Sequence, residues 1–278
     1  MIEDDSFIPG SACWIDVSTA DPAQTRDFYA GLFGWTYRID PNPRSRHYTT
    51  ALLRDRPVAG IAGVAVPEGQ PVTWTLYLNS ANVAHIAMLL EEWEGWVHYG
   101  PVEVAGQGSI LIGADPTGAV IGFWQPATTT WTFHTADPGS LVWAELNTWD
   151  GRRADGFFAS MFGYRQQQIG DGIDVDYTTW ALGERTILGR RQLDGGQAID
   201  TAAHWMLYFA VNPATGTDYA VNRVLDLGGR VTSDPFDSGL GRIAVVQDPS
   251  GATFSLIDPT HRIMAMTGVA GNDDPYDD

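Results

Sequence analysis

The chain has 278 residues, of which 34 are acidic and 16 basic, so its formal net charge at pH 7 is −18. Every basic residue is an arginine. The absence of lysine excludes Schiff-base chemistry, a lysine-held pyridoxal cofactor and a P-loop lysine, because each needs that amine. The single cysteine, Cys13, excludes an internal disulfide and any multi-cysteine metal site. The negative charge argues against nucleic acid and anionic membrane surfaces as partners.

The composition is that of a packed globular chain, with 44% hydrophobic and 18% charged residues. No apolar run approaches the ~20 residues that a membrane-spanning helix needs. The N-terminal segment MIEDDSFIPG is acidic and lacks the basic-then-apolar order of a signal peptide. These features predict a cytoplasmic protein of one large or two ordinary domains.

The first half of the chain predicts the order β-α-β-β-β, repeated once. Residues 12–18 have the alternation of a strand. Asp21 and Pro22 then supply the cap and the first turn of a helix that runs to about Leu32 and ends at Gly34. Short strands follow near 35–40, 47–53 and 58–65. The second cycle comprises a strand over 73–78, a helix near 81–93, and strands near 97–104, 109–113 and 119–125.

The second half repeats the first, and a repeat of this length decides the architecture. The first corresponding residues are 129 positions apart (143 − 14), and the later ones lie slightly further apart. The matched features are Trp14 and Trp143, Asp21 and Asp150, Phe28 and Phe157, Gly34 and Gly163, Tyr48 and Tyr177, and the turns Asp-Pro-Thr-Gly at 115–118 and Asp-Pro-Ser-Gly at 248–251.

The repeat divides the chain into two homologous domains, over residues 11–126 and 139–259, which a linker over 127–138 joins. The remaining segment, 260–278, is acidic and poor in apolar residues. We expect this tail to be disordered, since it has too few apolar side chains to form a core.

These motifs resemble the vicinal oxygen chelate superfamily, which includes glyoxalase, bleomycin-resistance and dioxygenase proteins. The resemblance rests on the pattern D-x6-F-Y-x4-G from Asp21 to Gly34, on Leu-Gly-Gly at 227–229, and on the two DPxG turns. It extends over nearly the whole chain outside the tails, and it is greatest to the tandem two-domain members common in actinomycetes, often found near natural-product pathways. It implies an α+β fold of two tandem glyoxalase-like domains, each built from two βαβββ modules that form a half-open barrel.

The resemblance also identifies where a metal would be bound. In metal enzymes of the family the ligands stand on the first, fifth and eighth strands of a domain. Those positions correspond here to Trp14, Thr75 and Gly122 in the first half, and to Trp143, Met206 and Ser255 in the second. None of these offers the imidazole, carboxylate or thiolate that a divalent metal prefers. We therefore expect neither a metal nor another cofactor.

Strand alternation predicts which side chains point into each cavity instead. Most are aromatic, and small residues, Gly122 and Ser255, stand at the former metal position on the eighth strand, which suits a flat, hydrophobic or aromatic small molecule. The alternative is that the tryptophans simply fill the core. The predicted ligand-binding residues are Trp14, Tyr48, Tyr77, Trp124, Trp143, Tyr177, Met206, Tyr208 and Ser255.

The same alternation places one carboxylate in each cavity, Asp16 and Glu145. A carboxylate in an apolar cavity has a raised pKa and is suited to act as a general acid or base. His204 is the histidine predicted to lie inward near an acid. These three residues are the catalytic candidates; the alternative is that the carboxylates are structural hydrogen-bond acceptors and that His204 is a rim residue without a role.

The predicted function is metal-independent binding of an aromatic or polyketide-like small molecule in specialised metabolism. Acid/base turnover by isomerisation, cyclisation or elimination stays open. One alternative is a resistance protein that sequesters a drug without catalysis. The other is a glyoxalase-like metalloenzyme, which the six unsuitable ligand positions disfavour. The expected partner is the small molecule alone, without nucleic acid or membrane, and both a monomer and a homodimer are compatible with the sequence.

Overall fold

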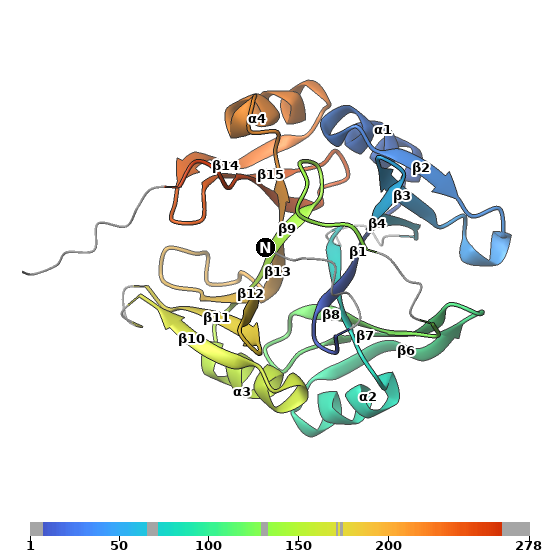
Figure 1. The fold of residues 1–278 in the computed structure, drawn as a ribbon, viewed down its shortest axis with the longest axis vertical. Coiled ribbons are helices and arrows are strands. Elements are labelled where there is room, and N and C mark those ends of the chain that lie inside the picture. The colour runs from blue at the N-terminus through green and yellow to red at the C-terminus, as the bar shows by residue number, and fades with distance from the viewer. Residues whose placement is uncertain (1–7, 66–71, 129–132, 171, 173–174, 263–278) are drawn as a thin grey trace, which may run out of the picture.

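The computed structural model describes residues 8–65, 72–128, 133–170, 172 and 175–262. It contains two eight-stranded sheets, one from each half of the chain (Figure 1). The predicted α+β fold of two tandem glyoxalase-like domains is confirmed, with βαβββ modules in the predicted order. The tail predicted to be disordered lies outside the described residues from position 263 onward. None of the described helices is long and apolar enough to cross a membrane.

The first domain consists of two modules. They comprise β1 (Ala12–Thr19), α1 (Pro22–Phe33), β2 (Thr36–Ile39), a short 3-10 turn (Pro43–Ser45), β3 (Thr49–Leu53) and β4 (Arg56–Gly63), followed by β5 (Trp74–Asn79), α2 (Val83–Glu92), β6 (Trp96–Val104), β7 (Gly108–Ala114) and β8 (Val120–Pro126).

The second domain repeats this order. Its elements are β9 (Leu141–Thr148), α3 (Gly151–Phe162), β10 (Arg165–Ile169), β11 (Tyr177–Leu182), β12 (Arg185–Gln192), β13 (His204–Ala210), α4 (Gly216–Asp226), β14 (Arg230–Asp237), β15 (Arg242–Gln247) and β16 (Thr253–Asp258).

The first strand of each module lies at the centre of its sheet. The strand orders are β2-β3-β4-β1-β5-β8-β7-β6 and β10-β11-β12-β9-β13-β16-β15-β14. The central strands pair antiparallel, β1 with β5 and β9 with β13. Each central strand also pairs in parallel with the last strand of its own module, as β1 does with β4. The result is a half-open barrel whose concave face is opposite the helices.

Local signals explain the helix boundaries. The Asp21 side chain accepts hydrogen bonds from the backbone N–H groups of Ala23 and Gln24 at 3.1 and 3.0 Å, which caps α1. The helix ends where Gly34 takes the left-handed conformation, at φ 73°. Asp150 and Gly163 do the same for α3. The predicted helix boundaries therefore follow from local chemistry.

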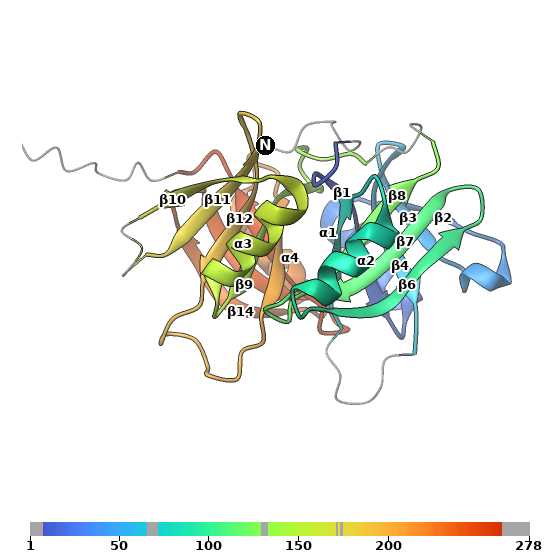
Figure 2. The ribbon, with the colours of Figure 1, turned by 90° about the horizontal axis from the view of Figure 1, so that it is seen from below.

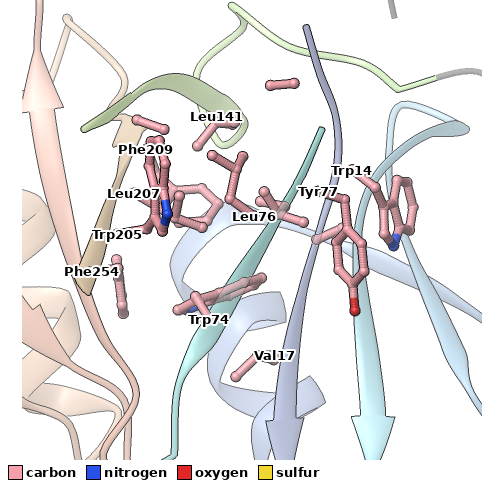
Figure 3. Packing of buried hydrophobic residues seen from close by; sticks show 14 of the residues in the cluster. Trp14, Val17, Trp74, Leu76, Tyr77, Leu141, Trp205, Leu207, Phe209 and Phe254 are labelled. Atoms are coloured by element: carbon pink, nitrogen blue, oxygen red, sulfur yellow. The ribbon is translucent and has the colours of Figure 1, made fainter. Parts of the chain in front are cut away.

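The two domains pack through their helix sides. Helix α1 lies beside α4, and α2 lies beside α3 (Figures 1 and 2). Trp74 of β5 and Phe209 of β13 meet between the sheets, with ring centroids 5.3 Å apart (Figure 3). The Tyr29 hydroxyl of α1 donates to the Asp248 carboxylate of the other domain at 3.2 Å. One continuous hydrophobic core therefore joins both domains.

Candidate ligand-binding site

The concave face of the first domain is built from β1 and its neighbours. Trp14 stands opposite Tyr77 of β5, and Asp16 stands opposite Thr75 on one side and Gly60 of β4 on the other. Residues directly opposite in a sheet share a face, so these side chains lie together. Figure 3 shows Trp14 and Tyr77 on the side of the sheet away from Trp74 and the interdomain core.

Three aromatic side chains surround the Asp16 carboxylate. The Tyr48 hydroxyl donates to Oδ2 of Asp16 at 3.2 Å, and Trp14 Nε1 donates to the Tyr48 oxygen at 2.7 Å. The Tyr77 hydroxyl donates to the same carboxylate at 3.2 Å. Burial raises the pKa of Asp16 to about 7, while the bonds from Tyr48 and Tyr77 lower it. Near neutral pH this carboxyl therefore exists in both protonation states.

The second domain repeats the constellation with Glu145 in place of the aspartate. Trp143 Nε1 donates to the Tyr177 oxygen at 3.0 Å, and the Tyr208 hydroxyl donates to Glu145 Oε1 at 2.7 Å. Burial raises the pKa of Glu145, against the lowering effects of the Tyr208 bond and the Arg191 charge. The structure thus brings together each predicted acid with its predicted tryptophan and tyrosines.

Three glycines make room for these tyrosines; the sequence singled out Gly122, as a former metal position, but not Gly60 or Gly189. A Cβ on Gly60 would lie 1.8 Å from the Tyr48 hydroxyl oxygen, and a Cβ on Gly189 would lie 2.2 Å from that of Tyr177. A Cβ on Gly122 would lie 2.1 Å from the Tyr77 ring. All three distances are shorter than any packed contact allows, so only glycine permits these ring positions.

The concave faces do not fit the metal that the fold's relatives hold. Trp14 uses its only ring nitrogen as a hydrogen-bond donor, and the Tyr77 ring fills the space above Gly122 where a metal-binding carboxylate would extend. In the second domain the three metal-ligand positions are occupied by Trp143, Met206 and Ser255. Across the described part of the chain, no three His, Cys, Asp or Glu side chains gather as a metal site. The mapped metal positions of each domain therefore supply no imidazole, carboxylate or thiolate to a divalent cation.

The two concave faces differ in how far they are covered. Phe133, from the predicted linker, packs edge-on against Trp14 with ring centroids 5.7 Å apart, and only 2% of its surface is exposed. The next residue, His134, donates its backbone N–H to the Pro57 carbonyl at 2.8 Å. Sequence reasoning missed this cover, because a contact between positions 119 apart (133 − 14) leaves no periodic signal.

In the second domain, the side chains at the positions equivalent to Trp14 and its neighbours form an aromatic wall, part of which packs against a cluster separate from the main core. Trp143, Tyr177 and Met206 are half-buried there. Trp143 and Met206 pack against a small cluster of Tyr208, Ile243 and Ile257, which is distinct from the main core. In the first domain Tyr48 is likewise half-buried, but Trp14, Tyr77 and Trp124 are buried and belong to the main core.

The other predicted residues take less central places. Trp124 is buried on β8. Ser255 lies opposite Tyr208 and is fully buried, and its hydroxyl has no hydrogen-bond partner among the described residues. His204 stands opposite Asn147, one row from Glu145, and its Nδ1 lies 2.9 Å from the Ala202 carbonyl oxygen. The structure therefore places His204 at the rim of the site.

A hollow of about 460 Å³ lies between the domains, on the helix side. It is lined partly by Phe33 of α1 and Tyr219 of α4, together with Arg54 and Arg223. None of the predicted site residues lines it. It lacks a buried acid and an enclosing aromatic wall, so we place the candidate site on the concave faces.

No family model matches the chain. It is 31% identical over 265 residues to the anthracycline biosynthesis protein DauV of Streptomyces sp. (strain C5), covering 91% of this chain and 94% of that protein. It is 31% identical over 277 residues to the anthracycline biosynthesis protein DnrV of Streptomyces peucetius, covering 95% and 98%. A third relative, 30% identical over 256 residues and covering 90% and 95%, is the "Putative glyoxylase CFP32" of Mycobacterium tuberculosis.

Solved structures agree with the fold. The Mn(II)-bound glyoxalase from Novosphingobium aromaticivorans superposes with a TM-score of 0.60 at 12% identity, over 93% of this chain and 89% of that one. A homoprotocatechuate 2,3-dioxygenase variant from B. fuscum also gives 0.60, at 14% identity, over 93% and 74%. At these identities the likeness concerns the fold alone.

The two concave sheets, each of paired βαβββ modules, define a tandem glyoxalase-like protein. The relatives found by sequence comparison identify the family to which this class of protein belongs. The chain belongs to the vicinal oxygen chelate superfamily.

Proposed function

We propose that this chain binds an aromatic, polyketide-type small molecule in specialised metabolism, on the concave face of its second domain and without a metal ion. The observation that carries the proposal is the half-buried wall of Trp143, Tyr177 and Met206, of which Trp143 and Met206 pack against a cluster separate from the main core. The equivalent tryptophan of the first domain is covered by Phe133. The two relatives named for anthracycline biosynthesis support a role in specialised metabolism.

We expect Trp143→Ala to weaken binding of 1,4-dihydroxyanthraquinone by about 10- to 100-fold, measured by equilibrium dialysis. Loss of one aromatic contact surface corresponds to roughly 1.5–3 kcal/mol of binding free energy. The matched control is Trp14→Ala, which removes the equivalent indole under Phe133 and should leave the affinity within about threefold. Circular dichroism verifies that each variant is folded, and Trp14→Phe replaces Trp14→Ala if the latter is not.

If Trp14→Ala weakened binding and Trp143→Ala did not, the binding site would lie in the first domain. Equal affinity in wild type, Trp143→Ala and Trp14→Ala would show that neither indole forms the ligand wall.

A second candidate function is proton transfer by Glu145. This carboxyl is 4% exposed, its pKa is raised by burial, and it accepts a hydrogen bond from Tyr208. A carboxyl with a raised pKa exchanges protons efficiently with a bound carbon acid. The competing role, sequestration without turnover, needs the aromatic wall but no titrating group.

Glu145→Gln separates the two roles. If the protein is an acid/base catalyst, wild type accelerates hydrogen–deuterium exchange at the acidic methylene of anthrone, followed by NMR in D2O. The variant should then lose about 100-fold or more of that acceleration, while its affinity for 1,4-dihydroxyanthraquinone changes little. A wild type that binds but does not accelerate exchange above buffer favours sequestration.

A further inference from the structure

Arg191 is a site residue that the sequence did not reveal. It lies on β12, opposite Tyr177 of β11 on one side and opposite Asn147 of β9 on the other. It follows Gly189 by two positions, and Gly189 stands opposite Glu145. Because side chains alternate along a strand, Arg191 projects from the same concave face as Glu145 and Tyr177.

The preceding residue, Arg190, differs from Arg191 in the face from which it projects and in its ion pairs. Arg190 projects from the other face, is 3% exposed, and pairs with Asp155 at 2.8 Å and Asp176 at 2.7 Å. Arg191 is exposed. None of the ion pairs among the described residues includes it. Its guanidinium is therefore unpaired within the part of the chain that the structure describes, and it is accessible to a ligand.

The charge of Arg191 reaches the candidate site. It lowers the pKa of Glu145, and it acts in the same direction on the pKa values of Tyr177 and Tyr208. Tyr177 belongs to the aromatic wall, and Glu145 and Tyr208 lie beside Met206 and Trp143 of that wall. His204, on the far side of Asn147, faces the same end of the site.

The first domain builds the same row of the sheet without a cation. There Ser18 stands opposite Ala62, at the positions that Asn147 and Arg191 occupy in the second domain. The fold therefore does not need an arginine at this position. No ion pair with another described residue accounts for Arg191.

We propose that Arg191 recognises an anionic oxygen on the ligand, so that the second domain selects aromatic molecules that carry a carboxylate or an ionised phenol. A guanidinium presents N–H donors in a planar fork that matches a carboxylate. The aromatic body then packs against Trp143 and Tyr177, and its anionic group lies at the rim beside Asn147. This inference rests on the proposed function, because it names the ligand class of the same site.

The test compares anthraquinone-2-carboxylate with its uncharged methyl ester by isothermal titration calorimetry. Wild type should bind the carboxylate at least about tenfold more tightly than the ester, since a charge-assisted bond is lost in the ester. Arg191→Gln should abolish that preference and leave the ester's affinity within about threefold. Arg191→Lys should keep part of it, because an ammonium keeps the charge without the fork.

The control is Arg152→Gln, which removes an equal charge from the exposed side of α3 in the same domain. It should retain the wild-type preference. If wild type and Arg191→Gln bind both compounds equally well, the inference about Arg191 is overturned while the aromatic site stands. If wild type binds neither compound, the proposed function fails, and the inference fails with it.

Discussion

Arg190→Ala is expected to lower the free energy of unfolding by about 3–5 kcal/mol, because it leaves two carboxylates without their shared cation. The guanidinium donates to Asp155 and Asp176 and to the Thr178 hydroxyl at 2.6 Å. Asp155 also accepts from Trp180 Nε1 at 2.7 Å. Removal of the arginine thus affects a network that links α3 to two strands. Urea denaturation at pH 7 measures the change.

The adjacent arginine provides the control for this substitution. Arg191→Ala removes an exposed guanidinium from the other face of the same strand and should change the free energy of unfolding by no more than about 0.5 kcal/mol. Equal effects of the two substitutions would contradict the assignment of Arg190 as the buried partner. An effect of Arg190→Ala below about 1 kcal/mol would show that the network adds little to stability.

Asp16→Asn is expected to flatten the dependence of stability on pH. The pKa of Asp16 is about 7 in the folded protein, against an ordinary value of 3.8. Between these values the folded state holds a proton that the unfolded state has lost. The free energy of unfolding therefore falls as pH rises from about 4 to 8, by on the order of 4 kcal/mol from this group. The variant cannot titrate at this position and lacks that contribution.

Urea denaturation between pH 4 and 8 measures the slope. Other buried acids act in the same direction: burial raises the pKa of Asp115 to about 6 and also raises the pKa of Asp248 and of Glu145. The difference between wild type and Asp16→Asn is therefore the informative quantity. Asp27→Asn, which removes an exposed carboxyl from α1, should keep the wild-type slope. Parallel curves for wild type and Asp16→Asn would refute a raised pKa at Asp16.

The elements of this fold could be predicted because their signals are local. Asp21 and Gly34 bracket α1, and Asp150 and Gly163 bracket α3, through hydrogen bonds and a left-handed turn within a few residues of each helix end. The repeat also predicted tertiary structure, because two halves of similar sequence are expected to form two sheets of the same topology. Strand alternation then placed Trp14, Asp16 and their counterparts on the concave faces.

The finer geometry of the site could not be predicted in the same way. That the Tyr48 ring lies above Gly60, and Tyr177 above Gly189, depends on strand register, which no single segment specifies. The sequence assigned residues 127–138 only as a linker, and it did not predict that Phe133 packs on Trp14. Two adjacent arginines look alike in the sequence, and only the pairing of β12 with its neighbours separates buried Arg190 from exposed Arg191.

The amino-acid pattern alone thus predicted the family, the duplicated α+β architecture and the lack of metal-binding side chains at the former metal positions, because each depends on residue type and spacing. The tertiary structure showed how unlike the two concave faces are. One is covered by Phe133 and continuous with the core, whereas the other has an aromatic wall packed on a separate cluster and, at its rim, Arg191, which is exposed and forms no ion pair with the described residues. That asymmetry comes from contacts between segments distant in the chain, where packing and charge pairing decide which side chains remain available to a ligand.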